Sequence, residues 1–367
     1  MEDELYHVMA FKPAFFENKF IHWSELPPHL KLQVLRNLPY PTLRNFMFLS
    51  KKCWTLSSMF KTEAACIFLD EMAFLSKFQG TRCKEKSMDL FVFYIPPGLK
   101  GIPNSHRKYQ LSFVEDKDGG CSVRRIGESR EWKRYSKGVR YSNETYFYAS
   151  LRVFFQLTKF IEAKDLLIEM STVNPEVESI LRELPASTSL SYESITIRTE
   201  DKALLPLFLP FINPGCKLSV YSFPFHETGD IFMDTAFFDS EMVRAAPSFR
   251  TESLTGVTDE QLLLLQGSRL FMKTPYISSK GINGILRQWS EGRRRIERIT
   301  LSETQILNHN DVVDGIDPSP ILVGDMRRYW DFRSRGFRTG IRNRAGDLIV
   351  VDVATNCCDI SPVFLNE

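Results

Sequence analysis

Two apolar stripes near the N-terminus have the spacing of short amphipathic helices. The first predicts a helix that begins near Pro27 with Ser24 as its N-cap, because a proline fits the first helical turn, where no backbone N–H is needed. Pro39 and Pro41 end that helix, and a second stripe follows them. The two stripes are formed by Leu30, Val34, Leu35 and Leu38, and then by Leu43, Phe46 and Met47. A module of about 40 residues rarely buries two apolar faces without disulfides, metal or a partner, so this pattern predicts a partner.

Residues 23–60 resemble the F-box, whose pattern is Leu-Pro, apolar residues at helical intervals, a second leucine-rich helix, and a Val-Ser-Lys-like turn before a tryptophan. The matching positions are Leu26, Pro27, Leu30, Val34, Leu35, Leu38, Leu43, Phe46, Leu49, Ser50, Lys51 and Trp54. The chain departs at His29, where the family usually has glutamate, and at Cys53, which places the tryptophan one position late. The alternative interpretation is an amphipathic hairpin that packs on its own domain.

The resemblance implies a three-helix F-box that docks on a Skp-family adaptor and, through it, on a cullin. It therefore implies an SCF-type ubiquitin ligase in which this chain is the substrate receptor, without enzymatic activity or a cofactor of its own. We expect eight residues to supply the adaptor contacts or the packing that presents them: Leu26, Pro27, Leu30, Val34, Leu35, Leu38, Leu43 and Phe46.

The segments on either side of this module have different patterns. Residues 1–22 are expected to form an N-terminal tail, and residues 61–142 a connecting helix and a small antiparallel element. The helix is predicted over residues 61–79, with Cys66, Leu69, Ala73 and Met72 on its buried side and Gly80 at its end. The antiparallel element is predicted from β-type runs at 90–95, 108–114 and 121–126, and an Asp-Gly turn at 117–120 joins the last two.

From about residue 143 to 367, helical stretches alternate with short β-type runs at intervals of roughly 20 to 31 residues. The runs are 166–170, 194–198, 217–221, 249–254, 269–272 and 298–301, and the helical segments include 201–211, 232–245, 258–266 and 278–291. Repeated strand–helix units of this length predict parallel strands with helical crossovers in an irregular leucine-rich-repeat-like stack. The predicted class is therefore α+β, with an N-terminal three-helix F-box and an α/β region for substrate recognition.

The C-terminal third contains a second, looser resemblance. Residues 281–301 contain an Asn-x-x-Leu-x-x-Trp helix followed by a strand, and residues 336–351 have the pattern of a hairpin with its turn between Asn343 and Gly346. Both resemble the F-box-associated module of large nematode F-box families. The resemblance supports a receptor and a nematode origin, and the alternative is an unrelated helix and hairpin.

The amino-acid composition limits the cellular location and the classes of partner that we expect. The 367 residues carry 47 basic and 45 acidic side chains, which gives a net charge of +2. A charge this small does not attract the whole protein to nucleic acid or to anionic membranes. Seven cysteines without repeated spacing favour a reducing compartment, and the acidic N-terminus lacks the plan of a secretion signal. No apolar run approaches the ~20 residues that span a bilayer. We therefore expect a cytoplasmic or nuclear protein.

Signals for catalysis or metal binding are weak. The six histidines do not have the spacing of a zinc-binding helix, and no nucleophile motif or phosphate-binding loop occurs. Cys357 and Cys358 are adjacent, so in a strand they point to opposite faces and are expected to be ordinary thiols. Gly281-x-x-Gly284 matches a short RNA-clamping loop only superficially, because it lies within a helical pattern.

An arginine-rich segment provides the main competing hypothesis. Arginines at 293–295, 298, 327, 328, 333, 335, 338, 342 and 344 mix with aromatic residues, while Glu291, Glu297, Asp325 and Asp331 would cancel part of the charge. A solvated face with local ion pairs is one interpretation. If the face is functional, an acidic or phosphorylated protein segment is the preferred ligand, bound by Arg327, Arg328, Tyr329, Trp330, Arg335 and Arg338. The alternative function is an RNA- or scaffold-binding protein that uses the same surface.

Overall fold

The computed structural model describes residues 23–38, 40–47, 49–59, 61–71, 86–95, 107–126, 139–171, 173, 175–184, 188–222, 230–319 and 336–363. Contacts divide the chain into two compact units, unit 1 (Met1–Pro185) and unit 2 (Ala186–Glu367). Residues 143–185, which the sequence assigned to the α/β region, group with unit 1 in this division.

The N-terminal part of unit 1 contains three short helices, α2 (Pro28–Arg36), α3 (Tyr40–Met47) and α4 (Lys51–Ser57). The expected start of α2 is confirmed within one residue, but Ser24 is not its cap. Pro27 occupies the N-cap position without a side-chain hydrogen bond, and the Ser24 carbonyl instead accepts a bond from Lys31 Nζ at 3.1 Å. In α4 the Ser50 hydroxyl accepts the Cys53 N–H at 3.1 Å, which is a true side-chain cap.

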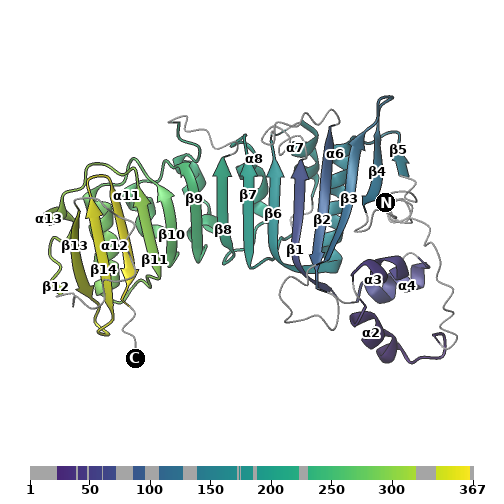
Figure 1. Ribbon diagram of the computed structural model, residues 1–367, viewed down its shortest axis with the longest axis horizontal. Coiled ribbons are helices and arrows are strands. Elements are labelled where there is room, and N and C mark those ends of the chain that lie inside the picture. The colour runs from purple at the N-terminus through teal and green to yellow at the C-terminus, as the bar shows by residue number, and fades with distance from the viewer. Residues whose placement is uncertain are drawn as a thin grey trace. The chain divides into compact units, whose positions relative to one another are not determined.

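A sheet follows in unit 1, with strand order β6-β1-β2-β3-β4-β5. Its strands are β1 (Thr62–Glu71), β2 (Ser87–Tyr94), β3 (Arg107–Glu115), β4 (Cys121–Ile126), β5 (Val139–Tyr141) and β6 (Ile161–Met170). Among the described strands of this sheet, β1 and β6 pair in parallel and the other neighbours pair antiparallel, and the predicted β3–β4 hairpin is confirmed. Helix α6 (Tyr146–Phe160) packs against β2, β3, β4 and β6 (Figure 1), and α7 (Pro175–Glu183) packs against α6.

The predicted helix over residues 61–79 is wrong where the structure describes it. Residues 62–71 form β1, which lies between β2 and β6. The run from Ala64 to Leu69 is apolar at every position, with Ile67 and Leu69 buried and Cys66 and Phe68 half-buried, so it lacks the polar alternation of a half-exposed strand and mimics a helical stripe. Residues 72–79 lie outside the described part of the chain.

Unit 2 contains a sheet with strand order β7-β8-β9-β10-β11-β15-β14-β13-β12. The strands are β7 (Ser194–Thr199), β8 (Lys217–Ser222), β9 (Ser248–Leu254), β10 (Arg269–Lys273), β11 (Arg298–Ser302), β12 (Pro318–Ser319), β13 (Phe337–Arg342), β14 (Leu348–Ala354) and β15 (Cys357–Pro362). Strands β7 to β11 pair in parallel, as their spacing predicts, and the remaining pairs are antiparallel. The expected hairpin at 336–351 is confirmed as β13 and β14, joined by a turn at residues 343–347.

Helices alternate with the parallel strands of unit 2. They are α8 (Leu204–Phe208) with the 3-10 turn η2 (Leu209–Phe211), α9 (Thr235–Asp239), α10 (Glu241–Arg244), α11 (Asp259–Leu264), α12 (Ser279–Ser290) and α13 (His309–Val312). Phe237 and Phe238 of α9 contact Phe249 of β9 at ring distances of 6.0 and 5.7 Å, so the face bearing Phe249 is covered by helices. By strand register, Leu218, Leu270 and Ile299 share this buried face. The intervening residues of β8 to β11 lie on the opposite face.

Candidate functional site

The three N-terminal helices have a small core of their own. Leu35, Leu43 and Met47 are only 1–3% exposed, so α2 and α3 bury their stripes within unit 1. Leu30 and Val34 also belong to the α2 stripe, yet they are 37% and 38% exposed. Because Leu30 and Val34 are one helical turn apart, they form an apolar strip on the outer side of α2.

The eight residues predicted to contact an adaptor therefore divide by exposure. Leu30, Val34 and Pro27 are exposed, whereas Leu35 and Leu43 are interior packing residues. Leu26, Leu38 and Phe46 are half-buried, and the Phe46 ring meets Trp23 edge-to-face at 5.1 Å. The structure thus places three of the eight where a partner can reach them directly.

Two exposed apolar side chains were not among those eight residues. Leu49 precedes α4 and is 57% exposed, and Met59 follows α4 and is 61% exposed. Neither belongs to an amphipathic stripe, so periodicity does not identify them. Large exposed apolar side chains on a module of this size are typical of a binding surface.

Helices α3 and α4 contact the rest of unit 1. Arg44 of α3 is 1% exposed, and its guanidinium lies 5.1 Å from the centre of the Tyr109 ring, which Arg125 also approaches at 5.1 Å. Trp54 of α4 meets Phe160 edge-to-face at 4.9 Å. Burial raises the pKa of Tyr109, so its phenol stays neutral between the two cations. The sequence pattern did not identify Arg44 as a buried residue, because an arginine on the polar face of a helix is normally exposed to solvent.

The arginine-rich surface predicted for target binding is described only in part. Arg327, Arg328, Tyr329, Trp330 and Arg335 lie outside the described residues. Arg338 lies on β13, where its guanidinium donates to Asp352 at 2.8 Å, and this hydrogen bond raises the pKa of Arg338. Its partner is therefore on the neighbouring strand β14, and the pairing with Asp325 or Asp331 considered from the sequence lies outside the described part.

The arginines at 293–295 have different environments. Arg293 and Arg295 are exposed and pair with Glu291 and Glu297, as the ion-pair interpretation expects. Arg294 is 8% exposed and donates to the Gly267 carbonyl and to Gln288 Oε1, each at 3.2 Å. Burial lowers the pKa of Arg294 to about 10. This side chain holds the end of α11 and belongs to the interior.

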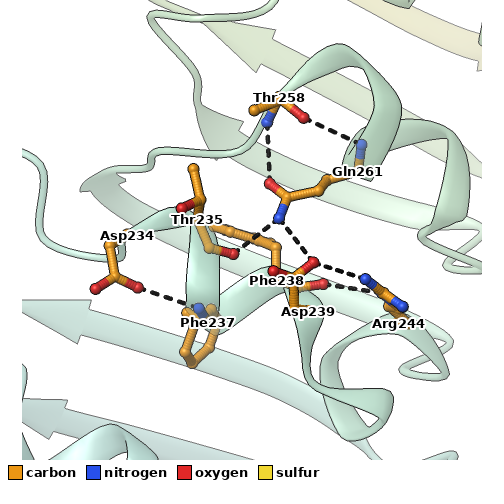
Figure 2. Close-up of polar contacts among 8 residues, drawn as sticks. All are labelled: Asp234, Thr235, Phe237, Phe238, Asp239, Arg244, Thr258 and Gln261. Carbon is orange, nitrogen blue, oxygen red and sulfur yellow. Dashed lines mark hydrogen bonds and ion pairs between the residues drawn. The ribbon is translucent and has the colours of Figure 1, made fainter.

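A polar junction centred on Gln261 joins α9, α10 and α11 (Figure 2). Its side-chain NH₂ donates to the Thr235 carbonyl and to Asp239 Oδ1, both at 2.9 Å, while Thr258 and Gln261 form a capping box. Arg244 donates to the same Asp239 oxygen at 2.6 Å, and the bond from Gln261 lowers the pKa of Asp239. These groups satisfy helix ends and one another and include no nucleophile, so the junction is structural.

The glycines at 281 and 284 lie inside helix α12, not in a loop. A Cβ at Gly281 would lie 2.1 Å from Asp259 Oδ1, and one at Gly284 would lie 2.7 Å from a Leu263 methyl. The absence of a side chain at these two glycines therefore permits close packing of α12 against α11. The adjacent Asn283 is buried and donates to the carbonyls of Val312 and Asp314, each at 2.9 Å, which explains an asparagine on this helix.

Within the described residues, no group of three or more His, Cys, Asp or Glu side chains could hold a metal ion. Cys358 is buried, and burial raises its thiol pKa, while Cys357 is half-buried. A thiol with a raised pKa is a poor nucleophile and a poor metal ligand. In the structure, therefore, Cys358 is a buried thiol and Cys357 a half-buried one.

Comparisons with known proteins identify one region. A family model described as F-box domain matches residues 23–60. No curated protein and no solved structure matches the chain. In the described part, no helix is long and apolar enough to cross a membrane. F-box domains bind a Skp-family adaptor within SCF complexes, and proteins that carry them are in general non-enzymatic substrate receptors. The chain thus carries an F-box domain at residues 23–60.

Proposed function

We propose that this protein is the substrate-recognition subunit of an SCF-type ubiquitin ligase. Its F-box would bind the adaptor through the outer side of α2, and the region from about residue 143 to 367 would select a target protein. The observation that carries the proposal is the exposure of Leu30 and Val34 on helix α2, in which Leu35 is fully buried and Leu32 is half-buried. Water-exposed aliphatic residues in register on one helix side are the normal form of a helix-docking surface.

The energetics agree with a partner of moderate to high affinity. Burying a large aliphatic side chain contributes about 1.5–3 kcal/mol, and Leu30 and Val34 are each only partly exposed now. Together they would contribute about 2–3 kcal/mol in a complex, which corresponds to about a 30-fold to 150-fold change in Kd. Leu49 and Met59 would extend the same surface if α4 takes part.

Adaptor binding is tested with a double variant, Leu30→Ala with Val34→Ala, in the full chain. The matched control is Leu264→Ala with Tyr276→Ala, two side chains of unit 2 that are 51% and 50% exposed. We expect the first variant to weaken binding of a purified Skp-family adaptor at least tenfold, while the control changes it less than twofold. Equal binding by all three folded proteins would refute the proposed docking side.

Target selection by the C-terminal region is the second part of the proposal. Supporting it are the parallel strand–helix units of unit 2, which we take to form a leucine-rich-repeat-like stack, and the arginine–aromatic segment containing Arg327, Arg328, Tyr329, Trp330, Arg335 and Arg338. We further propose a nematode-type F-box protein with a C-terminal F-box-associated module and a cytoplasmic or nuclear location. Exchange of unit 2, residues 186–367, for the corresponding region of another F-box protein leaves the unit 1 sheet whole and should change the recovered partners while adaptor binding stays intact.

The alternative from another class is an RNA- or scaffold-binding protein that uses the same arginine–aromatic segment. Retention of the full chain on a polyuridine column, measured against salt concentration, separates the two. RNA binding releases counterions and falls steeply with salt. Retention that survives 0.3 M salt, or none at 0.05 M, would contradict the alternative.

A further inference from the structure

An exposed phenylalanine lies in the middle of the polar face of the unit 2 sheet. Phe271 of β10 is 37% exposed, although both of its strand neighbours, Leu270 and Met272, are buried on the helix-covered face. Strand register places Arg250 directly beside it on β9, and the Arg250 guanidinium lies 5.2 Å from the centre of the Phe271 ring. An aromatic ring with a stacked arginine is the composition of protein-binding hot spots.

A row of cations runs along the beginnings of the same strands. Arg269 and Arg298 are directly opposite each other on β10 and β11, and their side chains are 61% and 55% exposed. Lys217, which is exposed, begins β8. Like charges directly opposite on neighbouring strands destabilise a sheet, so the fold itself gives no reason for this arrangement.

Nearby carboxylates compensate these charges only in part. The Arg250–Glu252 and Arg298–Asp359 distances are 3.5 and 3.6 Å, which are long for ion pairs. Asp359 also accepts a hydrogen bond from Thr300. Arg269 has a close ion pair with Glu297 at 2.5 Å, and Glu297 is shared with Arg295 at 3.3 Å. Five cations (Lys217, Arg250, Arg269, Arg295, Arg298) thus meet three carboxylates (Glu252, Glu297, Asp359), and the three arginine side chains on the strands remain more than half exposed.

We propose that Lys217, Arg250, Arg269, Phe271 and Arg298, the arginine–phenylalanine patch, bind an extended acidic segment of the target protein. The inference rests on the proposed receptor function and names its substrate class. Phe271 offers one apolar contact, and the guanidinium groups around it offer paired N–H donors that match carboxylates. Neighbouring strands are about 4.8 Å apart, and same-face side chains of an extended chain are about 6.6 Å apart, so carboxylates on alternate residues of a chain crossing β8 to β11 can reach the long side chains of cations on strands one or two apart.

A protein segment fits the patch better than nucleic acid does. Base stacking by single strands uses a series of aromatic platforms, whereas the described strands β8 to β11 expose Phe271 alone among large apolar residues of this face. Glu252 lies within the patch at 45% side-chain exposure and would repel a continuous phosphate backbone. A peptide with spaced carboxylates can avoid it.

The experiment selects random 12-residue peptides displayed on phage against the full chain bound to its Skp-family adaptor, after removal of phage that bind the adaptor alone. The test variant is Arg250→Gln, Arg269→Gln and Arg298→Gln together, and a second variant is Phe271→Ala. The control variant, Lys164→Gln, Arg182→Gln and Lys280→Gln, removes the same charge from exposed positions elsewhere. Affinities of the selected peptides and of a 12-nucleotide polyuridine RNA are measured by fluorescence anisotropy.

We expect the selected peptides to be acidic, to bind the test variant at least tenfold more weakly and Phe271→Ala about fivefold more weakly, and to bind the control within twofold of the parent. No enrichment, neutral or basic peptides, equal loss in the control, or tighter binding of RNA would each overturn the proposal. Adaptor affinity and melting temperature are measured for every variant, so a failed receptor function or a misfolded chain gives a different result.

Discussion

In each unit, side chains of like charge lie opposite one another on neighbouring strands, but those of unit 1 are buried and those of unit 2 are exposed. In unit 1, Glu169, Asp70 and Asp89 lie directly opposite one another on β6, β1 and β2, and all three are at most 3% exposed. In unit 2, Arg269 and Arg298 are opposite each other and remain more than half exposed. A buried row of acids costs folding free energy through desolvation, whereas an exposed row of arginines costs little and stays available to a ligand.

The acidic row shows how a sheet tolerates buried charge. Burial, and then the charges of Glu169, Asp89 and Glu71, raise the pKa of Asp70 to about 7. Asp89 accepts a hydrogen bond from Gln110 at 2.6 Å, and Glu71 accepts two from Ser171 at 2.6 Å. Asp70 is therefore held near its neutral form, while Asp89 of the row and the adjacent Glu71 are hydrogen-bonded.

The largest expected effect contrasts interior and surface arginines. Arg294→Ala removes donors from the Gly267 carbonyl and Gln288 and leaves a space in the interior, so we expect a loss of about 3 kcal/mol in the free energy of unfolding. Denaturant unfolding measures it. Arg293→Ala and Arg295→Ala, at exposed ion pairs, should each change stability by less than about 0.5 kcal/mol. Similar losses for all three would contradict the assignment of Arg294 to the interior.

The second prediction concerns the acidic row and pH. The folded-state pKa of Asp70 is raised to about 7 from 3.8, so the folded protein binds this proton more tightly than the unfolded chain. The loss of folding stability caused by ionised Asp70 is absent below about pH 4, grows as the pH rises from 4 to 7, and is then constant. Asp70→Asn should therefore leave stability unchanged at pH 4 and raise it by about 1–4 kcal/mol at pH 8. The control is Asp317→Asn, at an exposed position. Equal gains at both pH values would argue against a raised pKa.

The sequence predicted elements better than the contacts between them. The order of prolines and leucines identified the F-box helices, and short β-type runs located the parallel strands of unit 2. It mistook β1 for a helix, because the run Ala64–Leu69 is apolar at every position and shows no polar alternation, and it did not name α6.

Register explains most of what sequence analysis missed at the sites. Arg250 and Phe271 are 21 positions apart and become neighbours only when β9 and β10 pair, and the same holds for Asp70 with Glu169 across β1 and β6. Arg44 lies on Tyr109 through packing that no local pattern encodes. The exposure of Leu30 and Val34 beside the buried Leu35 also depends on how the three helices pack.

A third, smaller effect is expected where α12 approaches α11. Gly281→Ala would push a methyl group to within 2.1 Å of Asp259 Oδ1, which accepts the Ser278 N–H at 2.9 Å. The aspartate must rotate away, so we expect a loss of about 1–2 kcal/mol despite the better helix propensity of alanine. The matched control is Ser290→Ala at the other end of the same helix. Thermal melting in which Gly281→Ala is as stable as the parent would show that the helices can separate at little cost.

The smallest expected effect returns to the exposed row of unit 2. Arg269→Gln removes repulsion with Arg298 but also removes the ion pair with Glu297, and both interactions are exposed. The two terms are each about 0–1 kcal/mol and oppose each other, so stability should change by less than about 0.5 kcal/mol. Denaturant unfolding at low and at 0.5 M salt checks this, because screening weakens both terms together. A loss above about 1.5 kcal/mol would mean that Arg269 is needed by the fold. The row of arginines would then have a structural reason to exist, and its contrast with the buried acids of unit 1 would disappear.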